Sequence, residues 1–216
     1  MAVPRLRITE IFHSLQGESR TIGLPTVFVR LTGCPLRCQY CDTAYAFTGG
    51  EYFELEQVLE KVKAFNTPYI TVTGGEPLAQ KGPCESLLKA LCDLDYKVSI
   101  ETSGAMDISS VDPRVNVVLD LKTPDSGEMD KNLWSNIPLL KPTDEVKFVI
   151  CSRRDYDWAK FKLSELTLND KCDVLLSPSF EQLAPSQLAD WIVADNLPVR
   201  FQVQLHKILW NDEPGR

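Results

Sequence analysis

The chain has 216 residues, of which 44% are apolar and 25% are charged, and its formal net charge is −7. This length and apolar content suffice for one well-packed hydrophobic core and scarcely for two, so we expect a single domain over residues 1–216. The acidic balance argues against a nucleic-acid partner, and no apolar stretch approaches the roughly 20 residues of a membrane-spanning helix. Because residues 1–7 also lack the apolar region of a signal peptide, we expect a cytoplasmic protein with no membrane contact.

Apolar, β-branched runs of strand length recur along the chain, and amphipathic helical patterns separate several of them. In chain order we predict strands at 6–12, 27–31, 69–72, 97–100, 115–121, 145–150, 174–176 and 199–205. Helices are predicted at 55–65, 83–94, 156–166 and 185–195. Such strands, alternating with helices, are typical of a parallel sheet covered on both faces, so the fold class is α/β. A complete (β/α)₈ barrel takes about 250 residues, so we predict a partial, open (β/α) barrel of mainly parallel strands with truncated helices.

Polar residues gather where the predicted strands end. They occupy positions 33–34, 73–77, 101–104, 120–122, 177–178 and 204–207. Because the carboxyl ends of parallel strands meet at one rim, which is where ligand sites form, we expect these residues to surround a single site.

Three cysteines, Cys34, Cys38 and Cys41, form a CxxxCxxC motif on the loop after the second predicted strand. Cysteines bunched in this way in a reducing compartment indicate metal ligation, and thiolates suit either an iron–sulfur cluster or zinc. A closed structural zinc site requires a fourth protein ligand, and the sequence contains no second CxxC or HxxxH pair. Three ligands on a four-iron cluster leave one iron open to a small molecule, which favours the cluster. The remaining cysteines are predicted to be buried core thiols: Cys84, Cys92, Cys151 and Cys172.

The cysteine motif, with Tyr40 before its last cysteine, and the run Thr73-Gly-Gly-Glu-Pro77 together resemble the radical S-adenosylmethionine superfamily. Gly-Gly-Glu-Pro alone is equally a turn after a strand. The resemblance implies a [4Fe-4S] cluster on the three cysteines and S-adenosyl-L-methionine chelating the open iron. The cofactor-binding residues that it implies are Tyr40, Cys41, Asp42, Gly74, Gly75, Glu76, Ser103, Asp120, Leu121, Lys122, Ser177 and Pro178.

A closer resemblance, from Ile11 to the C-terminus, is to the 7-carboxy-7-deazaguanine synthase family. It rests on five segments: 14–18, 28–34, 41–43, 101–104 and 204–207. The family converts 6-carboxy-5,6,7,8-tetrahydropterin to 7-carboxy-7-deazaguanine with loss of ammonia, a carbon–nitrogen lyase step towards queuosine. A 5′-deoxyadenosyl radical removes the hydrogen at C6 and later returns it, and magnesium assists. The resemblance also implies a homodimer and a low-potential electron donor such as flavodoxin.

Arg30 interrupts an apolar strand, and a buried arginine is costly unless an anion pairs with it. The substrate carboxylate is one such anion, because a guanidinium binds a carboxylate through two parallel hydrogen bonds. A structural salt bridge to Glu18 or Glu101 is the alternative.

The other substrate residues follow from the family resemblance, and each also has a plainer interpretation. Residues Leu15, Gln16, Gly17, Glu18 and Thr73 are assigned to the pterin, and Pro214 is expected to close its pocket. The 15–18 segment is otherwise a solvated turn, and relatives commonly carry glycine where this chain has Ser19, so we expect a shifted loop. Thr43 offers the hard oxygen that Mg²⁺ prefers, although a threonine here is also a common helix cap.

Two other functions remain open from the residues alone. An activase of a glycyl-radical enzyme shares the cysteine loop and the Gly-Gly-Glu-Pro turn, but gives no reason for Arg30. A zinc-binding interaction module, which is not an enzyme, accounts for the cysteines only. His206, one of two histidines, is predicted to be structural and not catalytic.

Overall fold

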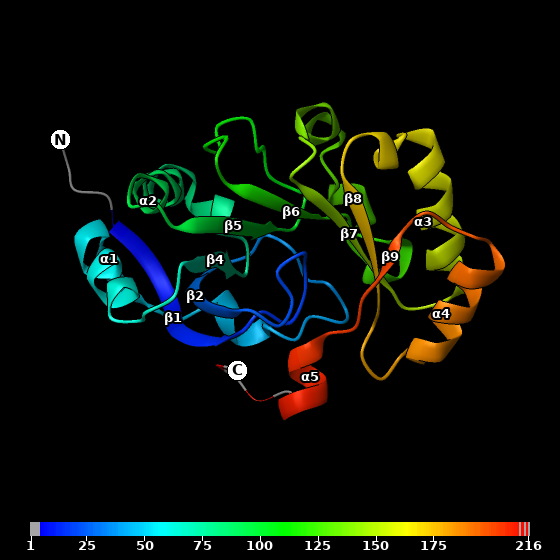
Figure 1. The fold of residues 1–216 in the computed structure, drawn as a ribbon, viewed down its shortest axis with the longest axis horizontal. Helices are drawn as coiled ribbons and strands as arrows, with labels where there is room; N and C mark the ends of the chain where they lie inside the picture. The colour runs from blue at the N-terminus through cyan, green and yellow to red at the C-terminus, as the bar shows by residue number, and fades with distance from the viewer. Residues whose placement is uncertain (1–4, 212, 214, 216) are drawn as a thin grey trace.

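The computed structural model describes residues 5–211, 213 and 215, so the prediction for Pro214 lies outside the described residues. Within that part of the chain, nine strands form one curved sheet in the order β3-β1-β2-β4-β5-β6-β7-β8-β9 (Figure 1). The strands are β1 (Arg5–Leu15), β2 (Pro25–Leu31), β3 (Glu51–Glu54), β4 (Tyr69–Gly74), β5 (Lys97–Thr102), β6 (Asn116–Asp120), β7 (Glu145–Ile150), β8 (Asp173–Pro178) and β9 (Arg200–Phe201). All pairs from β2 to β9 are parallel, while β1 pairs antiparallel with both β2 and β3. The expected open, mainly parallel α/β architecture is therefore confirmed.

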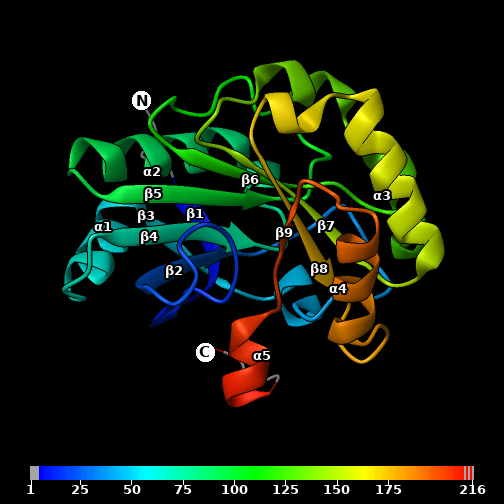
Figure 2. The ribbon, with the colours of Figure 1, turned by 45° about the vertical axis from the view of Figure 1, so that its right-hand side comes forward.

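Four helices cover the outer face of the described sheet, and a fifth lies elsewhere. The helices are α1 (Leu55–Lys63), α2 (Lys81–Asp93), α3 (Arg153–Glu165), α4 (Pro185–Ala194) and α5 (Leu205–Trp210). Figures 1 and 2 show α1 to α4 around the outside of the curve, whereas α5 stands apart on the open side. The prediction of cover on both faces was wrong, because the curvature leaves the inner face to line a cavity. No helix among the described residues has the length and apolar character needed to cross a bilayer.

The strands alternate between the two faces, and β7 shows this most clearly. Val146, Phe148 and Ile150 belong to the hydrophobic core under the helices. Lys147 and Val149 point to the other face and line the cavity. Because side chains alternate along a strand, a strand buried on both sides can place one charged residue inside without disturbing its core face.

Two elements differ from the prediction. Strand β3 was missed, since its four residues are mostly exposed and exist as a strand only through pairing with Arg5–Ile8 of β1. The predicted strand at 199–205 is only two residues long, and Leu205 begins helix α5. The chain leaves the sheet there because Gln202 hydrogen-bonds to Ser19 and the Leu205 N–H donates to the Gly17 carbonyl.

The four cysteines outside the motif do not all lie in the core. Cys84, Cys92 and Cys172 are buried, as predicted. Cys151 is only half-buried, and the Gln39 amide from the cysteine loop donates to its sulfur at 3.5 Å. It follows β7 on the rim of the sheet, where the chain turns toward the cysteine loop, so the prediction of a core position was wrong for this thiol.

Candidate active site

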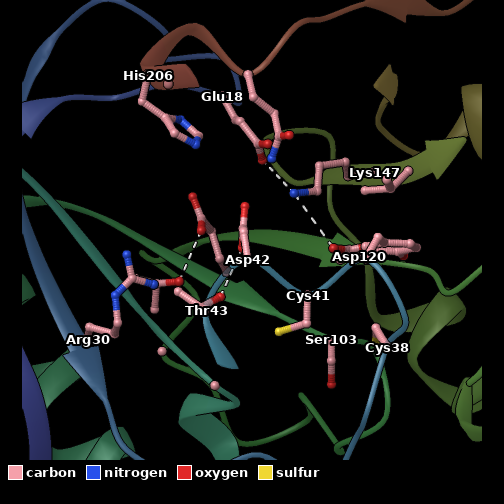
Figure 3. A pocket seen from close by; sticks show the side chains of 18 of the residues that line it. Glu18, Arg30, Cys38, Cys41, Asp42, Thr43, Ser103, Asp120, Lys147 and His206 are labelled. Atoms are coloured by element: carbon pink, nitrogen blue, oxygen red, sulfur yellow. Dashed lines mark hydrogen bonds and ion pairs between the residues drawn. The ribbon is translucent and has the colours of Figure 1, made fainter. Parts of the chain in front are cut away.

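A cavity of about 560 Å³ opens on the inner face of the sheet, a volume suited to a small-molecule site. Its walls come from the inner strand faces, the cysteine loop, residues 15–18 and helix α5 (Figure 3). The predicted residues that it brings together are Leu15, Gln16, Gly17, Glu18, Arg30, Cys34, Cys38, Tyr40, Cys41, Asp42, Thr43, Thr73, Gly74, Gly75, Ser103, Asp120 and Lys122. Most of the expected site thus converges in one place.

Four predicted cofactor residues do not line the cavity. Leu121 is fully buried in the core, and Ser177, Pro178 and Glu76 lie behind the wall. Glu76 accepts hydrogen bonds from the Leu78 N–H, the Thr102 hydroxyl and the Ser103 N–H and hydroxyl. Its carboxylate therefore joins the ends of β4 and β5, which makes it a structural support for the Gly74–Gly75 turn.

The cysteine loop presents its three thiols on the cavity wall, each half-exposed. Burial raises the pKa of the Cys38 thiol to about 11, and it also raises the pKa of Cys34. Because iron binds the thiolate, cluster binding would have to displace these protons. Three cysteines on one short loop are the donor set of a [4Fe-4S] cluster, in which each thiolate binds a different iron. No group of His, Cys, Asp or Glu in the described part of the chain is arranged to hold one metal ion.

The Gly74–Gly75 turn packs directly against the start of this loop. A Cβ atom added to Gly75 would lie 2.4 Å from the Gly33 carbonyl oxygen and 2.8 Å from the Cys34 Cβ. The Glu76 N–H donates to that same carbonyl at 2.8 Å. The turn and the cysteine loop are therefore in direct backbone contact. This contact fixes their relative position, and the absence of a side chain at Gly75 leaves space for a ligand that contacts both.

Four charged side chains alternate in sign across the floor of the cavity. Lys147 Nζ lies 2.5 Å from Glu18 Oε2 and 3.6 Å from Asp120 Oδ2, and Lys122 Nζ lies 3.0 Å from the same Asp120 oxygen. Burial would lower the pKa of both lysines, but the carboxylates around them raise it, so both remain charged. Lys147 was not among the predicted site residues. The signal that applied to Arg30, a cation inside an apolar strand, marks Lys147 too.

Three cavity-lining residues have a buried polar atom with no hydrogen-bond partner among the described residues. The atoms are Glu18 Oε1, Tyr40 OH and Asp120 Oδ1. Leaving such an atom buried and unpaired costs about 1–3 kcal/mol, so native proteins rarely retain several together without a ligand or water to satisfy them. Tyr40 belongs to the cysteine loop and Asp120 lies near Cys38, where the hydroxyl and amino groups of S-adenosylmethionine would supply partners. The residues present therefore fit the cluster and its cofactor.

Arg30 has an ion-pair partner that the sequence prediction did not name. Its Nε lies 2.6 Å from Glu10 Oε1, and the Tyr45 hydroxyl donates to the same oxygen at 2.8 Å. A bulge in β1 between Ile8 and Glu10 places Glu10 directly opposite Arg30, so both side chains point to the same face. The predicted alternatives, Glu18 and Glu101, were wrong, because Glu18 pairs with Lys147 and Glu101 accepts hydrogen bonds from Gln16 and Thr73.

Residues 16–18, directly after the end of β1 at Leu15, form a buried loop, so the alternative of a solvated turn is wrong. Gln16 and Glu18 are 2% and 7% exposed. The Gln16 amide donates to the Thr71 hydroxyl at 3.1 Å and accepts the Glu18 N–H at 3.2 Å. Ser19 adopts a φ of 66°, in the left-handed region that favours glycine. The loop therefore keeps the backbone expected of a glycine, and hydrogen bonds between Ser19 and Gln202 hold it there.

Helix α5 completes the wall opposite the sheet. Lys207 lies 2.9 Å from Asp42, the residue after the last cysteine of the motif. Burial alone would raise the pKa of Asp42, but this ion pair and its hydrogen bond lower it to about 2. His206 packs against Gly17, where an added Cβ would lie 2.2 Å from its Nδ1.

Thr43 precedes a 3-10 helix (Ala44–Phe47), but its side chain forms no capping hydrogen bond with that helix. The Thr43 hydroxyl instead donates to Asp42 at 3.1 Å.

Comparison with known proteins agrees with this geometry. Residues 28–160 match the model of the Radical SAM superfamily. The 7-carboxy-7-deazaguanine synthase of Chlorobaculum tepidum is 44% identical over 211 residues, covering 96% of each chain. That of Koribacter versatilis is 39% identical over 222 residues, covering 96% of this chain and 98% of its own. A crystal structure of QueE from Escherichia coli covers 94% of this chain and 95% of its own with a TM-score of 0.73, and at 23% identity it supports the fold alone.

These relatives match along nearly the whole length of both chains, so the resemblance is not confined to the cysteine loop that an activase or a zinc module would share. Membership of the radical S-adenosylmethionine superfamily also implies a [4Fe-4S] cluster and S-adenosylmethionine as cofactors. The chain belongs to the 7-carboxy-7-deazaguanine synthase family within that superfamily.

Proposed function

We propose that this chain is a 7-carboxy-7-deazaguanine synthase, a carbon–nitrogen lyase of queuosine biosynthesis. It contracts the ring of 6-carboxy-5,6,7,8-tetrahydropterin and releases ammonia. One observation carries the proposal: a single cavity joins the three-thiol loop to a guanidinium and to the buried 16–18 loop. These are the groups needed to hold a cluster-bound cofactor beside a carboxylated pterin.

In this proposal the residues of the chain bind and orient the substrate and the cofactors, and the cofactors supply the redox chemistry. When bound, the reduced cluster and S-adenosylmethionine provide the one-electron chemistry that begins the reaction. Arg30 holds the substrate carboxylate, with Glu10 fixing the guanidinium through its Nε. The unpaired Glu18 Oε1 accepts from the pterin N–H groups, and Gln16 holds the loop in place. Leu15, Gly17 and Thr73 complete the substrate site in this proposal, with Ser103 on the cofactor side.

Replacing Arg30 with methionine is expected to lower kcat/KM for the pterin about 100-fold, because a charge-assisted hydrogen bond contributes about 1.5–3 kcal/mol. The affinity for S-adenosylmethionine should not change. Steady-state kinetics and equilibrium dialysis measure the two effects. Arg153→Met, which removes an exposed guanidinium on α3, is the matched control. An unchanged kcat/KM in Arg30→Met would contradict the assignment of the carboxylate to this residue.

We also propose that Thr43 binds Mg²⁺ together with the substrate carboxylate, since its hydroxyl faces the cavity beside Asp42. Thr43→Ala is expected to raise the Mg²⁺ concentration needed for half-maximal activity roughly tenfold, whereas Thr43→Ser retains the hydroxyl and should stay close to the wild type. Titration of activity with Mg²⁺ after chelation measures this. Equal Mg²⁺ requirements in the wild type and Thr43→Ala would remove Thr43 from the metal site.

Anaerobic incubation of reconstituted protein with the pterin, S-adenosylmethionine, dithionite and Mg²⁺ tests the function itself. We expect ammonia and the deazapurine in equal amounts, with S-adenosylmethionine regenerated. No product from protein that holds its cluster would favour the activase alternative. Protein that reconstitutes colourless, with zinc alone, would favour the interaction module.

Three further features belong to the same proposal. The buried apolar residues form one contiguous core, which supports a single domain over residues 1–216. A homodimer and a low-potential electron donor such as flavodoxin rest on the family resemblance alone. Sedimentation velocity and turnover with reduced flavodoxin in place of dithionite test these two partners.

A further inference from the structure

Lys147 lies at the centre of the cavity floor, between two carboxylates that come from different parts of the chain. Figure 3 shows its ammonium between Glu18, on the loop after β1, and Asp120, at the end of β6. The distances are 2.5 Å to Glu18 Oε2 and 3.6 Å to Asp120 Oδ2. The Lys147 and Glu18 side chains are 11% and 9% exposed, so solvent screens this pair little.

Each carboxylate directs one oxygen to the lysine and leaves the other without a partner. Glu18 Oε1 and Asp120 Oδ1 are buried and form no hydrogen bond with any described residue. Both residues line the cavity, and they come from different elements. Glu18 belongs to the loop that carries Gln16, whereas Asp120 pairs with Lys122, whose ammonium lies 5.8 Å from the centre of the Tyr40 ring beside the cysteines.

We propose that Lys147 is a positioning residue that couples the two subsites of this cavity, holding Glu18 for the pterin and Asp120 for S-adenosylmethionine. This inference rests on the proposed function. Among the ion pairs of the described residues, Lys147 is the side chain that joins both carboxylates, since Lys122 pairs with Asp120 alone. A ligand that orders one carboxylate therefore also orders the lysine, and through it the second carboxylate.

Fold stability gives no sufficient reason for a lysine at this position. The hydrophobic core is formed by the opposite face of β7, and replacing both partners of a buried ion pair with apolar side chains is often neutral or stabilising. The lysine is useful only if the two carboxylates must be charged and oriented. A coupling free energy is reciprocal, so the pterin should tighten S-adenosylmethionine binding by the same factor as S-adenosylmethionine tightens pterin binding.

Binding measurements on the cluster-loaded protein test this without turnover, because no reductant is added. Dissociation constants for S-adenosylmethionine are measured by equilibrium dialysis with and without the pterin, and those for the pterin with and without S-adenosylmethionine. In the wild type we expect each ligand to tighten the other at least about fivefold. In Lys147→Met we expect both affinities to fall about tenfold and the coupling to drop below roughly twofold, whereas Lys147→Arg should retain part of it.

Two controls separate positioning from folding. Lys160→Met removes an exposed lysine that pairs with Asp195 on the outer face, and should behave as the wild type. In Glu18→Gln, adding Lys147→Met should not weaken pterin binding further but should still weaken S-adenosylmethionine binding. The double variant leaves no unpaired negative charge at position 18, so it should fold better than Lys147→Met. It replaces that single variant in the test if Lys147→Met alone fails to bind iron or shows the circular dichroism spectrum of an unfolded protein.

The inference would be overturned if Lys147→Met retained the full coupling between the two ligands. It would also be overturned if Lys147→Met weakened pterin binding equally in the wild type and in Glu18→Gln. A wild type with no coupling between the two ligands would overturn it as well. Failure of the proposed function gives a different result, in which both ligands bind and affect one another but reductant yields no deazapurine.

Discussion

Cys38→Ala is expected to leave the protein folded but without its cluster and without activity. The three thiols of the cysteine loop are the ligands available to a [4Fe-4S] cluster, and two thiolates hold it too weakly to survive purification. The visible absorption of the reconstituted protein should be lost, iron should fall far below four atoms per chain, and cleavage of S-adenosylmethionine should become undetectable. Cys34→Ala and Cys41→Ala should behave alike, because the proposed cluster needs one thiolate for each of three irons.

The matched control is Cys92→Ala, which removes a buried thiol from helix α2, away from the cavity. It should cost about 1 kcal/mol of stability, the transfer free energy and small cavity left by one sulfur, while iron content and activity remain. If Cys38→Ala retained full iron and activity, another side chain would have to be the third ligand. Cys151, half-buried beside Gln39, would be the next thiol to examine.

Gly75→Ala is expected to impair both the cofactor site and the stability of the protein. The new Cβ would lie 2.4 Å from the Gly33 carbonyl and 2.8 Å from the Cys34 Cβ, and neither neighbour is the end of a flexible side chain. The turn or the cysteine loop must shift, at about 1–3 kcal/mol by analogy with overpacked cores. S-adenosylmethionine affinity should fall at least about tenfold, and the electron paramagnetic resonance signal of the reduced cluster should respond less to added S-adenosylmethionine.

Gly82→Ala is the same substitution as Gly75→Ala, but it is expected to stabilise the protein. Gly82 lies in the first turn of α2, and no atom is within 4 Å of an added Cβ. Alanine should raise the free energy of unfolding by about 0.5–1 kcal/mol, because it loses less backbone entropy than glycine in a helix. Chemical denaturation of both variants measures this. Equal cofactor affinity in Gly75→Ala and Gly82→Ala would show that the contact with Gly33 does not shape the site.

Much of the fold is predictable because the local patterns and the tertiary contacts agree. The run Glu145–Ile150 is predicted with its observed bounds, since three of its residues form a core face and flanking polar segments end it. Helix α1 follows from its apolar stripe, with Val58 and Val62 buried. Strand β3 gives no such signal, because a short exposed run becomes a strand only when β1 provides its hydrogen-bond partner.

The candidate site likewise contains residues that the sequence indicates and residues that only the tertiary contacts reveal. The spacing of Cys34, Cys38 and Cys41, the Gly-Gly-Glu-Pro run and the isolated Arg30 indicate their chemistry by residue type and position, because each is a departure from ordinary strand or turn composition. Lys147 carries the same kind of signal as Arg30, and only its contacts with Glu18 and Asp120 show that it matters.

Residue type and spacing within short segments are therefore enough to predict the α/β class and the family, and to propose Cys34, Cys38 and Cys41 as cluster ligands. The partner of each buried charge is settled only by long-range contacts, which place Glu10 beside Arg30 and Lys147 between two carboxylates. The same contacts make Glu76 a support behind the cavity wall and end the last predicted strand at α5. The physical reason is that pairing between buried charges depends on strand register and on a single β-bulge, which join residues far apart in the chain.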